Sequence, residues 1–237
     1  MSYIVVAYFT RGTLYEVEVK RLLTSLIRFG IPYYVEPVED RGSWYLNTQW
    51  KPQFVSNMLD KFPDKSIIYV DCDAEFCRPP DLFEILHGRP DVNVGVHLLD
   101  HKKRGRDVAF ELLSGTIFFK NNKIVRGIVN DWITECSKGD KVWDQNALCK
   151  VLQGIPFQVL PEEYCTIFDY MKDIVNPVIK HYQASRKVTS KYGKLPLING
   201  NEQPCQNAIK KSEVVRRPKR VGRGGLVRYH IRNRNSE

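Results

Sequence analysis

Residues Ile67 to Glu75 read IIYVDCDAE, an apolar strand pattern that runs directly into alternating acids. In an extended backbone, residues i and i+2 point the same way, so Asp71 and Asp73 would present two carboxylates together at the end of this strand. Two adjacent carboxylates repel each other unless a cation lies between them, and hard divalent cations prefer oxygen ligands. The stretch therefore indicates a metal site, with two acids in a solvated turn as the alternative.

The segments before this stretch alternate between strand and helix patterns. Tyr3 to Phe9 is a nearly continuous β-branched and aromatic run, typical of a strand buried in a parallel sheet, and Tyr33 to Val38 is a second, aromatic strand pattern. Thr13 to Phe29 has apolar residues at helical spacing and is stopped by Gly30, and we expect a second helix with Pro52 in its first turn. This order predicts an α/β fold with a Rossmann-like, mostly parallel central sheet, flanking helices, and a ligand at the carboxyl ends of the strands.

The later segments extend this pattern and then lose it. We expect strands over Val92 to Leu98, Thr116 to Phe119 and Phe157 to Leu160, and helices over Lys123 to Cys136 and Asp144 to Leu152. Periodicity fades after Glu162, and from Lys210 charged residues alternate with glycine and proline without an amphipathic period. We therefore predict a single domain over residues 1–209 and a basic C-terminal arm over residues 210–237.

Composition bounds the class of protein. A chain of 237 residues with 43% hydrophobic and 27% charged residues is that of an ordinary globule with one sizeable core, which excludes a repeat array, a fibre or a disordered protein. No apolar run approaches the roughly 18 residues that span a bilayer. The first strand pattern follows Ser2 at once, and the six cysteines form no CxxC pair. We therefore expect no membrane segment, reduced thiols, no structural zinc and a cytoplasmic location.

The positive charge of the chain is concentrated at its C-terminal end. Between Lys210 and Arg234 ten basic residues face Glu213 alone, so this segment carries +9, the formal net charge of the whole chain. A polyanionic partner such as nucleic acid would bind there, and a solubilising tail is the alternative. A second basic run, HKKRGR, begins at His101. The candidate acceptor-binding residues in the two segments are Lys102, Lys103, Arg104, Arg217, Arg220 and Tyr229.

A second group of polar residues follows a late apolar run. His181 ends this run, and Ser185, Arg186 and Lys187 come shortly after it. One imidazole with two carboxylates suits Mn²⁺ somewhat better than Mg²⁺ or Ca²⁺ because nitrogen is the softer ligand. The hydroxyl and the two cations could bind phosphate oxygens. Taken alone, His181 is also compatible with a structural histidine whose hydrogen bonds are satisfied in the core.

Together with two further motifs these residues carry a resemblance. The motifs are SGTIFF over Ser114 to Phe119 and WDQNAL over Trp143 to Leu148. In combination with Asp71-Cys72-Asp73 and His181, they resemble the GT-A family of nucleotide-sugar glycosyltransferases, in particular small nucleotide-diphospho-sugar transferases and the glycogenin-type group. The likeness extends from Tyr3 to Lys187 and includes the order of the elements.

The resemblance implies a site for a nucleoside diphosphate sugar, with a UDP-sugar favoured. It implies that Asp71, Asp73 and His181 bind Mn²⁺ or Mg²⁺, which would bridge the two phosphates. It further implies that Asp144 and Gln145 face the sugar and the acceptor. If the reaction inverts the anomeric centre, Asp144 would be the base; the DQ pattern instead favours retention. The donor-binding residues that it implies are Tyr8, Thr10, Glu36, Lys51, Ser114, Gly115, Ser185, Arg186 and Lys187.

Each of these assignments has a structural alternative. Tyr8 could be core packing, Glu36 a solvated surface acid, Gly115 a bulge and Asp144 a helix N-cap. For Lys51 we expect an exposed position near a helix N-terminus, where the helix dipole disfavours a cation, which favours a functional reason for this lysine. Two other functions remain open: a non-catalytic nucleic-acid-binding module, and a metal-dependent nucleotidyl transferase or phosphodiesterase. Within the glycosyltransferase reading, the acceptor hydroxyl could lie on a modified DNA base.

Overall fold

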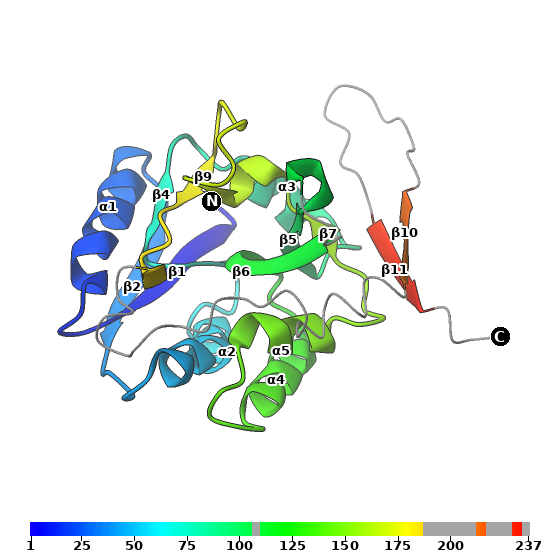
Figure 1. Cartoon of the computed structure of the whole chain (residues 1–237), viewed down its shortest axis with the longest axis horizontal. Helices are drawn as coiled ribbons and strands as arrows, with labels where there is room; N and C mark the ends of the chain where they lie inside the picture. The colour runs from blue at the N-terminus through cyan, green and yellow to red at the C-terminus, as the bar shows by residue number, and fades with distance from the viewer. Residues whose placement is uncertain (106–109, 187–211, 217–228, 234–237) are drawn as a thin grey trace.

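The computed structural model describes residues 1–105, 110–186, 212–216 and 229–233. Its centre is a six-stranded sheet in the order β2-β1-β3-β6-β5-β7 (Figure 1). All neighbouring strands pair in parallel except at β6, which is antiparallel to both β3 and β5. Its strands are β1 (Tyr3–Thr10), β2 (Tyr33–Val38), β3 (Ser66–Val70), β5 (Val94–Asp100), β6 (Phe110–Phe119) and β7 (Gln158–Val159). The predicted α/β class with a mostly parallel sheet is confirmed.

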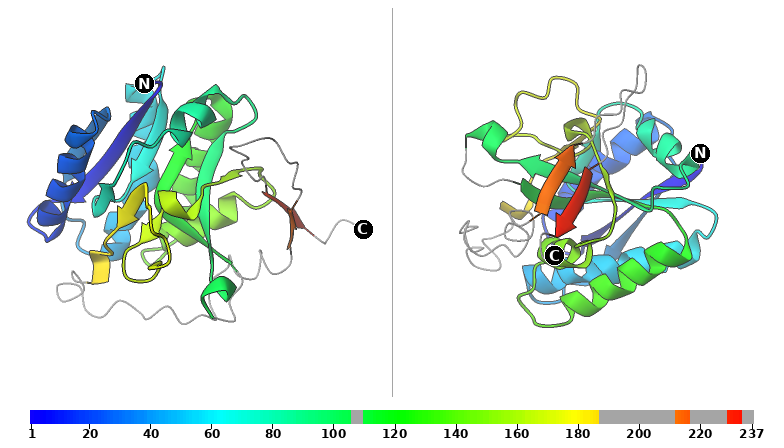
Figure 2. Two further views of the ribbon diagram at one scale, coloured as in Figure 1. Left: turned by 90° about the horizontal axis from the view of Figure 1, so that it is seen from above. Right: turned by 90° about the vertical axis from the view of Figure 1, so that its right-hand side faces the viewer.

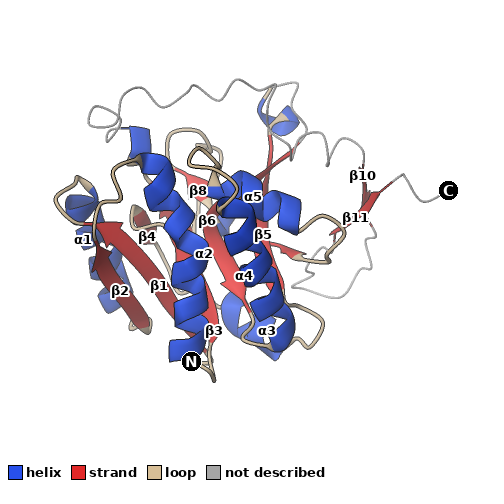
Figure 3. Cartoon of the chain, turned by 90° about the horizontal axis from the view of Figure 1, so that it is seen from below, coloured by secondary structure: helices blue, strands red, loops and turns tan. Residues whose placement is uncertain are grey.

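Helices cover the two faces of this sheet. On one face α2 (Trp44–Lys61), α4 (Lys123–Cys136) and α5 (Asp144–Val151) lie side by side (Figure 3). Their apolar residues form one core cluster with β1, β3, β5 and β6, in which Phe54 and Trp132 are fully buried. On the other face α1 (Tyr15–Arg28) and α3 (Leu82–Gly88) form a second cluster around Leu22, Leu26 and Phe83. The two views in Figure 2 show the sheet between these layers.

A small second sheet explains how residues distant in sequence meet. It contains β4 (Ala74–Phe76), β9 (Ile179–His181) and β8 (Thr166–Ile167), in the order β4-β9-β8. Ala74 pairs with His181 in the antiparallel β4-β9 ladder. Because Ala74 directly follows Asp73, this register brings His181 to the acids that end β3. The sequence did not predict this sheet, since strands of two or three residues are too short to show a period.

Helix α2 begins at Trp44, earlier than the prediction of Pro52 in the first turn allows. Ser43 caps it by accepting a hydrogen bond at its side-chain oxygen from the Leu46 N–H, at 3.1 Å. Pro52 therefore lies inside the helix rather than in its first turn, which corrects the prediction. Lys51 accordingly lies in mid-helix and is buried, not exposed near the N-terminus. We predicted a first-turn position because proline is common in the first turn of a helix and rare in its interior.

The remaining elements are short. Two 3₁₀ turns are η1 (Lys102–Arg104) and η2 (Glu162–Tyr164). Within the predicted arm, β10 (Ser212–Arg216) and β11 (Tyr229–Asn233) pair antiparallel. The boundary near residue 210 stays a prediction. No helix in the described ranges has the length and apolarity that crossing a membrane requires.

The cysteines depart in one place from what we expected. Cys72, Cys77, Cys136 and Cys165 are free thiols, as predicted. Cys149 on α5 is disulfide-bonded, which corrects the expectation of reduced thiols throughout the chain.

Candidate active site

One cavity gathers most of the residues that the sequence singled out. It opens at the carboxyl ends of β1 and β3, as expected for an open α/β sheet, and its walls come from α2, β6, the start of α5 and the turn after β9. The predicted residues that line it are Tyr8, Thr10, Lys51, Asp71, Asp73, Ser114, Gly115, Asp144, Gln145, His181 and Ser185. Candidate metal ligands and candidate catalytic residues therefore share one space.

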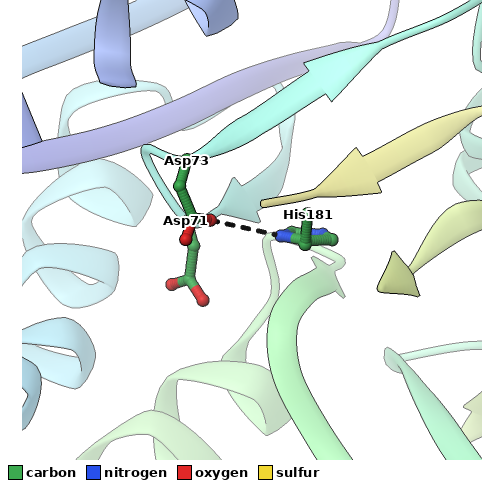
Figure 4. Close-up of side chains that lie close together, drawn as sticks. All are labelled: Asp71, Asp73 and His181. Carbon is green, nitrogen blue, oxygen red and sulfur yellow. Dashed lines mark ion pairs between the residues drawn. The ribbon is translucent and has the colours of Figure 1, made fainter. Parts of the chain in front are cut away.

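The predicted metal ligands come together in this cavity. Ligand atoms of Asp71, Asp73 and His181 all lie within 4.8 Å of one another, and the Asp73 Oδ1 lies 3.7 Å from the His181 Nδ1 (Figure 4). Two carboxylates with one imidazole form a ligand set suited to a divalent cation such as Mn²⁺. The close approach of two acids, with an imidazole nitrogen beside them, fits such an ion.

The surroundings hold these three side chains in place. The Ala184 N–H donates to the Asp73 Oδ2 at 2.7 Å, and the Thr116 hydroxyl hydrogen-bonds to the His181 Nε2 at 2.8 Å. The second contact leaves Nδ1 as the ring nitrogen that faces the acids. A Cβ at Gly115 would lie 3.2 Å from the Asp71 Oδ2 and 3.2 Å from the His181 Cε1. Gly115 also lies in an irregularity of the β5-β6 ladder, whose register shifts between Val96 and His97, so the bulge alternative holds as well. The glycine leaves room for both candidate ligands within that bulge.

The electrostatics of the two acids differ. Loss of solvent in the cavity, reinforced by the neighbouring Asp73, raises the pKa of Asp71. Burial alone would also raise the pKa of Asp73, but the neighbouring His181 and the hydrogen bond from the Ala184 N–H outweigh it and lower that pKa. Burial disfavours the His181 imidazolium, yet the neighbouring Cys165 and Asp73 raise its pKa to about 10.

Lys51 connects the metal ligands to the candidate catalytic pair. Its ammonium lies 3.1 Å from the Asp71 Oδ1 and 2.9 Å from the Asp144 Oδ2, and it is only 3% exposed. It also donates to the Ser114 hydroxyl at 3.1 Å. Burial lowers the pKa of Lys51, but Asp144 and Asp71 together raise it above the ordinary value. A cation fixed between these two carboxylates was not expected from the sequence.

Asp144 and Gln145 begin α5 and point into the cavity. Asp144 is not the N-cap, a position that Trp143 occupies without a side-chain capping bond. Its Oδ2 instead accepts a hydrogen bond from the Ser114 hydroxyl at 2.9 Å, in addition to the contact with Lys51. The Gln145 Oε1 accepts from the Ser114 N–H at 3.2 Å. The N-cap alternative for Asp144 is therefore excluded, and both side chains are held by the SG motif of β6.

A buried polar chain that the sequence did not predict continues from Gln145. Its Nε2 donates to the Glu111 Oε1 at 2.8 Å, and the Glu111 Oε2 lies 2.7 Å from the His101 Nε2. The His101 Nδ1 in turn contacts the Tyr170 hydroxyl at 3.1 Å. With both ends of its amide bonded, Gln145 has a fixed orientation. Nothing in the local sequence around Glu111 indicates this role, because its partners come from distant segments.

Three aromatic residues that are not among the predicted site residues form part of the cavity wall. Tyr15 begins α1, Trp44 begins α2 and Trp143 precedes α5, and all three line the cavity. The Trp44 and Trp143 ring centroids lie 5.8 Å apart, with the rings edge to face. The Gln49 amide fixes the loop before Trp143 by donating to the carbonyls of Gly139 and Val142, at 2.9 and 2.8 Å. Local sequence patterns do not predict that these three aromatic side chains line the same cavity.

Other predicted site residues lie outside this cavity. Glu36 on β2 accepts a hydrogen bond from the Tyr34 hydroxyl at 2.8 Å, and Arg186 forms an ion pair with Asp169. In η1, Lys103 lies 2.8 Å from Glu162. Arg104 pairs with Asp173 and Glu162, whereas Lys102 is exposed. Tyr229 is on β11, opposite Arg216. Lys187, Arg217 and Arg220 lie outside the described residues.

Comparison with known proteins supports the fold. No family model matches the sequence, and no curated protein matches it. Among solved structures, the chain is similar to a glycosyltransferase involved in the glycosylation of the major capsid of PBCV-1, with a TM-score of 0.62 and 16% identity over 78% of this chain and 96% of that one.

A second similar structure is the apo form of the glycosyltransferase GlyE from Streptococcus pneumoniae TIGR4. Its TM-score is 0.52 and its identity 16%, over 77% of this chain and 54% of that chain. The chain therefore shares its fold with glycosyltransferases of known structure, and the predicted GT-A architecture is confirmed.

Proposed function

We propose that this protein is a metal-dependent glycosyltransferase that transfers a sugar from a nucleoside diphosphate sugar to an acceptor hydroxyl. The observation that supports this most directly is that one cavity, in a fold shared with glycosyltransferases, holds both the Asp71, Asp73 and His181 cluster and the Asp144 and Gln145 pair. A diphosphate needs cationic charge and a reacting sugar needs fixed polar groups. The acids that would hold a cation and the polar pair that would face the sugar line the same cavity.

The residues at the metal cluster would bind and activate the donor. Asp71, Asp73 and His181 would hold Mn²⁺ or Mg²⁺, which when bound neutralises charge on the two phosphates of the donor. Ser185 also lines this end of the cavity, and its hydroxyl is suited to a phosphate oxygen. We assign the nucleoside to the region of Tyr8 and Thr10, which line the cavity at the end of β1. A UDP-sugar is the donor that we favour.

Asp144 and Gln145, which lie near the metal cluster on the other side of Lys51, would orient the sugar. As the bond between the anomeric carbon and the diphosphate oxygen lengthens, positive charge develops on the sugar ring. A carboxylate held in one position by Lys51 and Ser114 would stabilise that charge without reorganising. We favour net retention, with Asp144 and Gln145 positioning the sugar rather than forming a covalent bond to it. In an inverting reaction Asp144 would instead take the acceptor proton.

For the acceptor we propose a nucleic acid, with the hydroxyl on a modified base. The basic segment from Lys210 to Arg234, with its charge of +9, supports this proposal. The loop at η1 supports it less, because acids already pair with Lys103 and Arg104.

Turnover of nucleotide sugars tests the proposal. Purified protein with Mn²⁺ and a panel of UDP-sugars should release UDP and free sugar slowly without an acceptor, and Asp73→Asn should abolish release. Asp64→Asn, which changes an exposed acid at a distance from the cavity, should leave it unchanged. Release of a nucleoside monophosphate would instead identify a phosphodiesterase or nucleotidyl transferase. Absence of turnover, together with absence of any Mn²⁺ effect on thermal stability, would favour a binding module.

A further inference from the structure

The turn after β9 contains a residue in an unusual backbone conformation. Gln183 has a φ of +53°, and it is the only residue other than glycine with a positive φ in the part of the chain that the structure describes. Side chains with a Cβ disfavour this left-handed region, and glutamine lacks the short polar side chain that helps asparagine to adopt it. Such outliers concentrate at functional sites, and Gln183 lies two residues after His181 and lines the cavity.

The backbone of this turn has a clear role. The Tyr182 N–H donates to the Asp73 carbonyl at 3.2 Å, and the Ala184 N–H donates to the Asp73 carboxylate at 2.7 Å. The Arg186 N–H closes the turn on the Gln183 carbonyl at 3.0 Å. The left-handed residue therefore directs an N–H group at a metal ligand. A glycine would make the same turn without steric cost, so the backbone does not account for a glutamine side chain here.

The chemistry of the glutamine side chain indicates what it does. A neutral amide carries two N–H donors and one carbonyl acceptor. In a cavity that Asp73 and His181 also line, such an amide adds a hydrogen-bond donor without adding a charge. The ligand expected there is a diphosphate, whose oxygens are strong acceptors and form short, charge-assisted hydrogen bonds.

We propose that Gln183 is a donor-binding residue whose amide N–H groups hydrogen-bond to the diphosphate of the nucleotide sugar, next to the metal. This inference rests on the proposed function and adds a residue to it. Gln183 keeps an unfavourable backbone conformation because its side chain binds substrate, so stability and substrate affinity should respond in opposite directions when that side chain is removed.

Three substitutions test this inference through binding rather than turnover. Isothermal titration of nucleoside diphosphates (UDP, CDP, GDP, ADP and dTDP) in Mn²⁺ identifies the tightest ligand of the wild-type protein. Gln183→Gly should melt at the same temperature as wild type or higher, and should bind that ligand about tenfold more weakly, as expected for one lost charge-assisted hydrogen bond. Gln183→Glu, which has the same shape, should bind it more weakly still because a carboxylate repels phosphate. Gln183→Asn, which keeps the amide, should bind more tightly than Gln183→Gly.

Two controls separate this contact from other effects. Gln153→Gly, at an exposed position after α5, should bind the ligand as wild type does. Affinity for Mn²⁺ alone should be the same in Gln183→Gly and wild type. The inference is overturned if Gln183→Gly folds and binds the nucleotide within twofold of wild type, or if its Mn²⁺ affinity falls in parallel, since the turn would then act through Asp73. If the wild-type protein binds no nucleoside diphosphate, the proposed function itself fails.

Discussion

At the scale of single residues, the site depends on the absence of a side chain at one position. Gly115 lies against both Asp71 and His181, and a Cβ there would lie 3.2 Å from atoms of each. This is tighter than an ordinary van der Waals contact, so one of the two ligands would have to move. A small shift of a ligand is costly because metal affinity depends on geometry.

We therefore predict that Gly115→Ala folds but binds Mn²⁺ about tenfold or more weakly, a loss in the range found when residues that support metal ligands are changed. Mn²⁺ titration followed by electron paramagnetic resonance measures this directly. Gly127→Ala is the matched control, because a Cβ at Gly127 on α4 meets nothing within 4 Å and alanine favours a helix. Equal Mn²⁺ affinity in Gly115→Ala and Gly127→Ala would contradict the role assigned to Gly115.

At the scale of elements, α2 supplies a buried cation to two acids. Lys51 lies in the middle of this helix, 2.9 Å from Asp144 and 3.1 Å from Asp71. The Asp144 side chain is almost fully buried, with 1% of the residue exposed. Removing one partner of a buried ion pair costs more than the pair contributes, because the remaining charge is left without compensation.

Lys51→Met should accordingly lower the free energy of unfolding by about 3 kcal/mol. Mn²⁺ should then raise the melting temperature of Lys51→Met more than that of wild type, because the metal becomes the nearest counter-charge to the acids. Differential scanning calorimetry with and without Mn²⁺ measures the loss of stability and the rise in melting temperature that Mn²⁺ causes. Lys20→Met, on the exposed side of α1, is the control. A melting temperature unchanged in Lys51→Met would show that the ion pairs do not stabilise the fold.

The same elements show how far the sequence predicts this structure. The strands Tyr3–Thr10 and Ser66–Val70 are almost wholly apolar, so their pattern was sufficient to predict the parallel half of the sheet and the acids at its edge. The short strand that carries His181 has no such pattern, and it exists only because it pairs with β4. Glu111 and Gln183 were missed because tertiary contacts and backbone conformation, not local sequence, define their roles.

At the scale of the whole molecule, charge separates two regions. The segment from Lys210 to Arg234 carries +9 and the remainder sums to zero. Since affinity for a polyanion depends on the number of phosphate charges that are neutralised, the arm should dominate any binding to nucleic acid. The domain predicted over residues 1–209 would then bind the donor, and the arm would bind the acceptor.

Deleting residues 210–237 should remove most affinity for a DNA duplex at low salt while leaving UDP-sugar hydrolysis within about twofold of the full chain. Fluorescence anisotropy at several salt concentrations measures the DNA affinity, and a UDP-release assay measures the hydrolysis. The slope of log affinity against log salt should also fall. If DNA affinity survives the deletion, the arm is a solubilising tail rather than an acceptor-binding segment.

The central claim is that two acids from the end of β3 and an imidazole from β9 form one metal site that serves a nucleotide donor. The most direct measurement is equilibrium Mn²⁺ binding by electron paramagnetic resonance, with and without UDP. We predict one bound Mn²⁺ per chain, held more tightly when UDP is present, and lost in Asp73→Asn and in His181→Ala. Mn²⁺ binding that is independent of UDP and unchanged in both variants would contradict the claim.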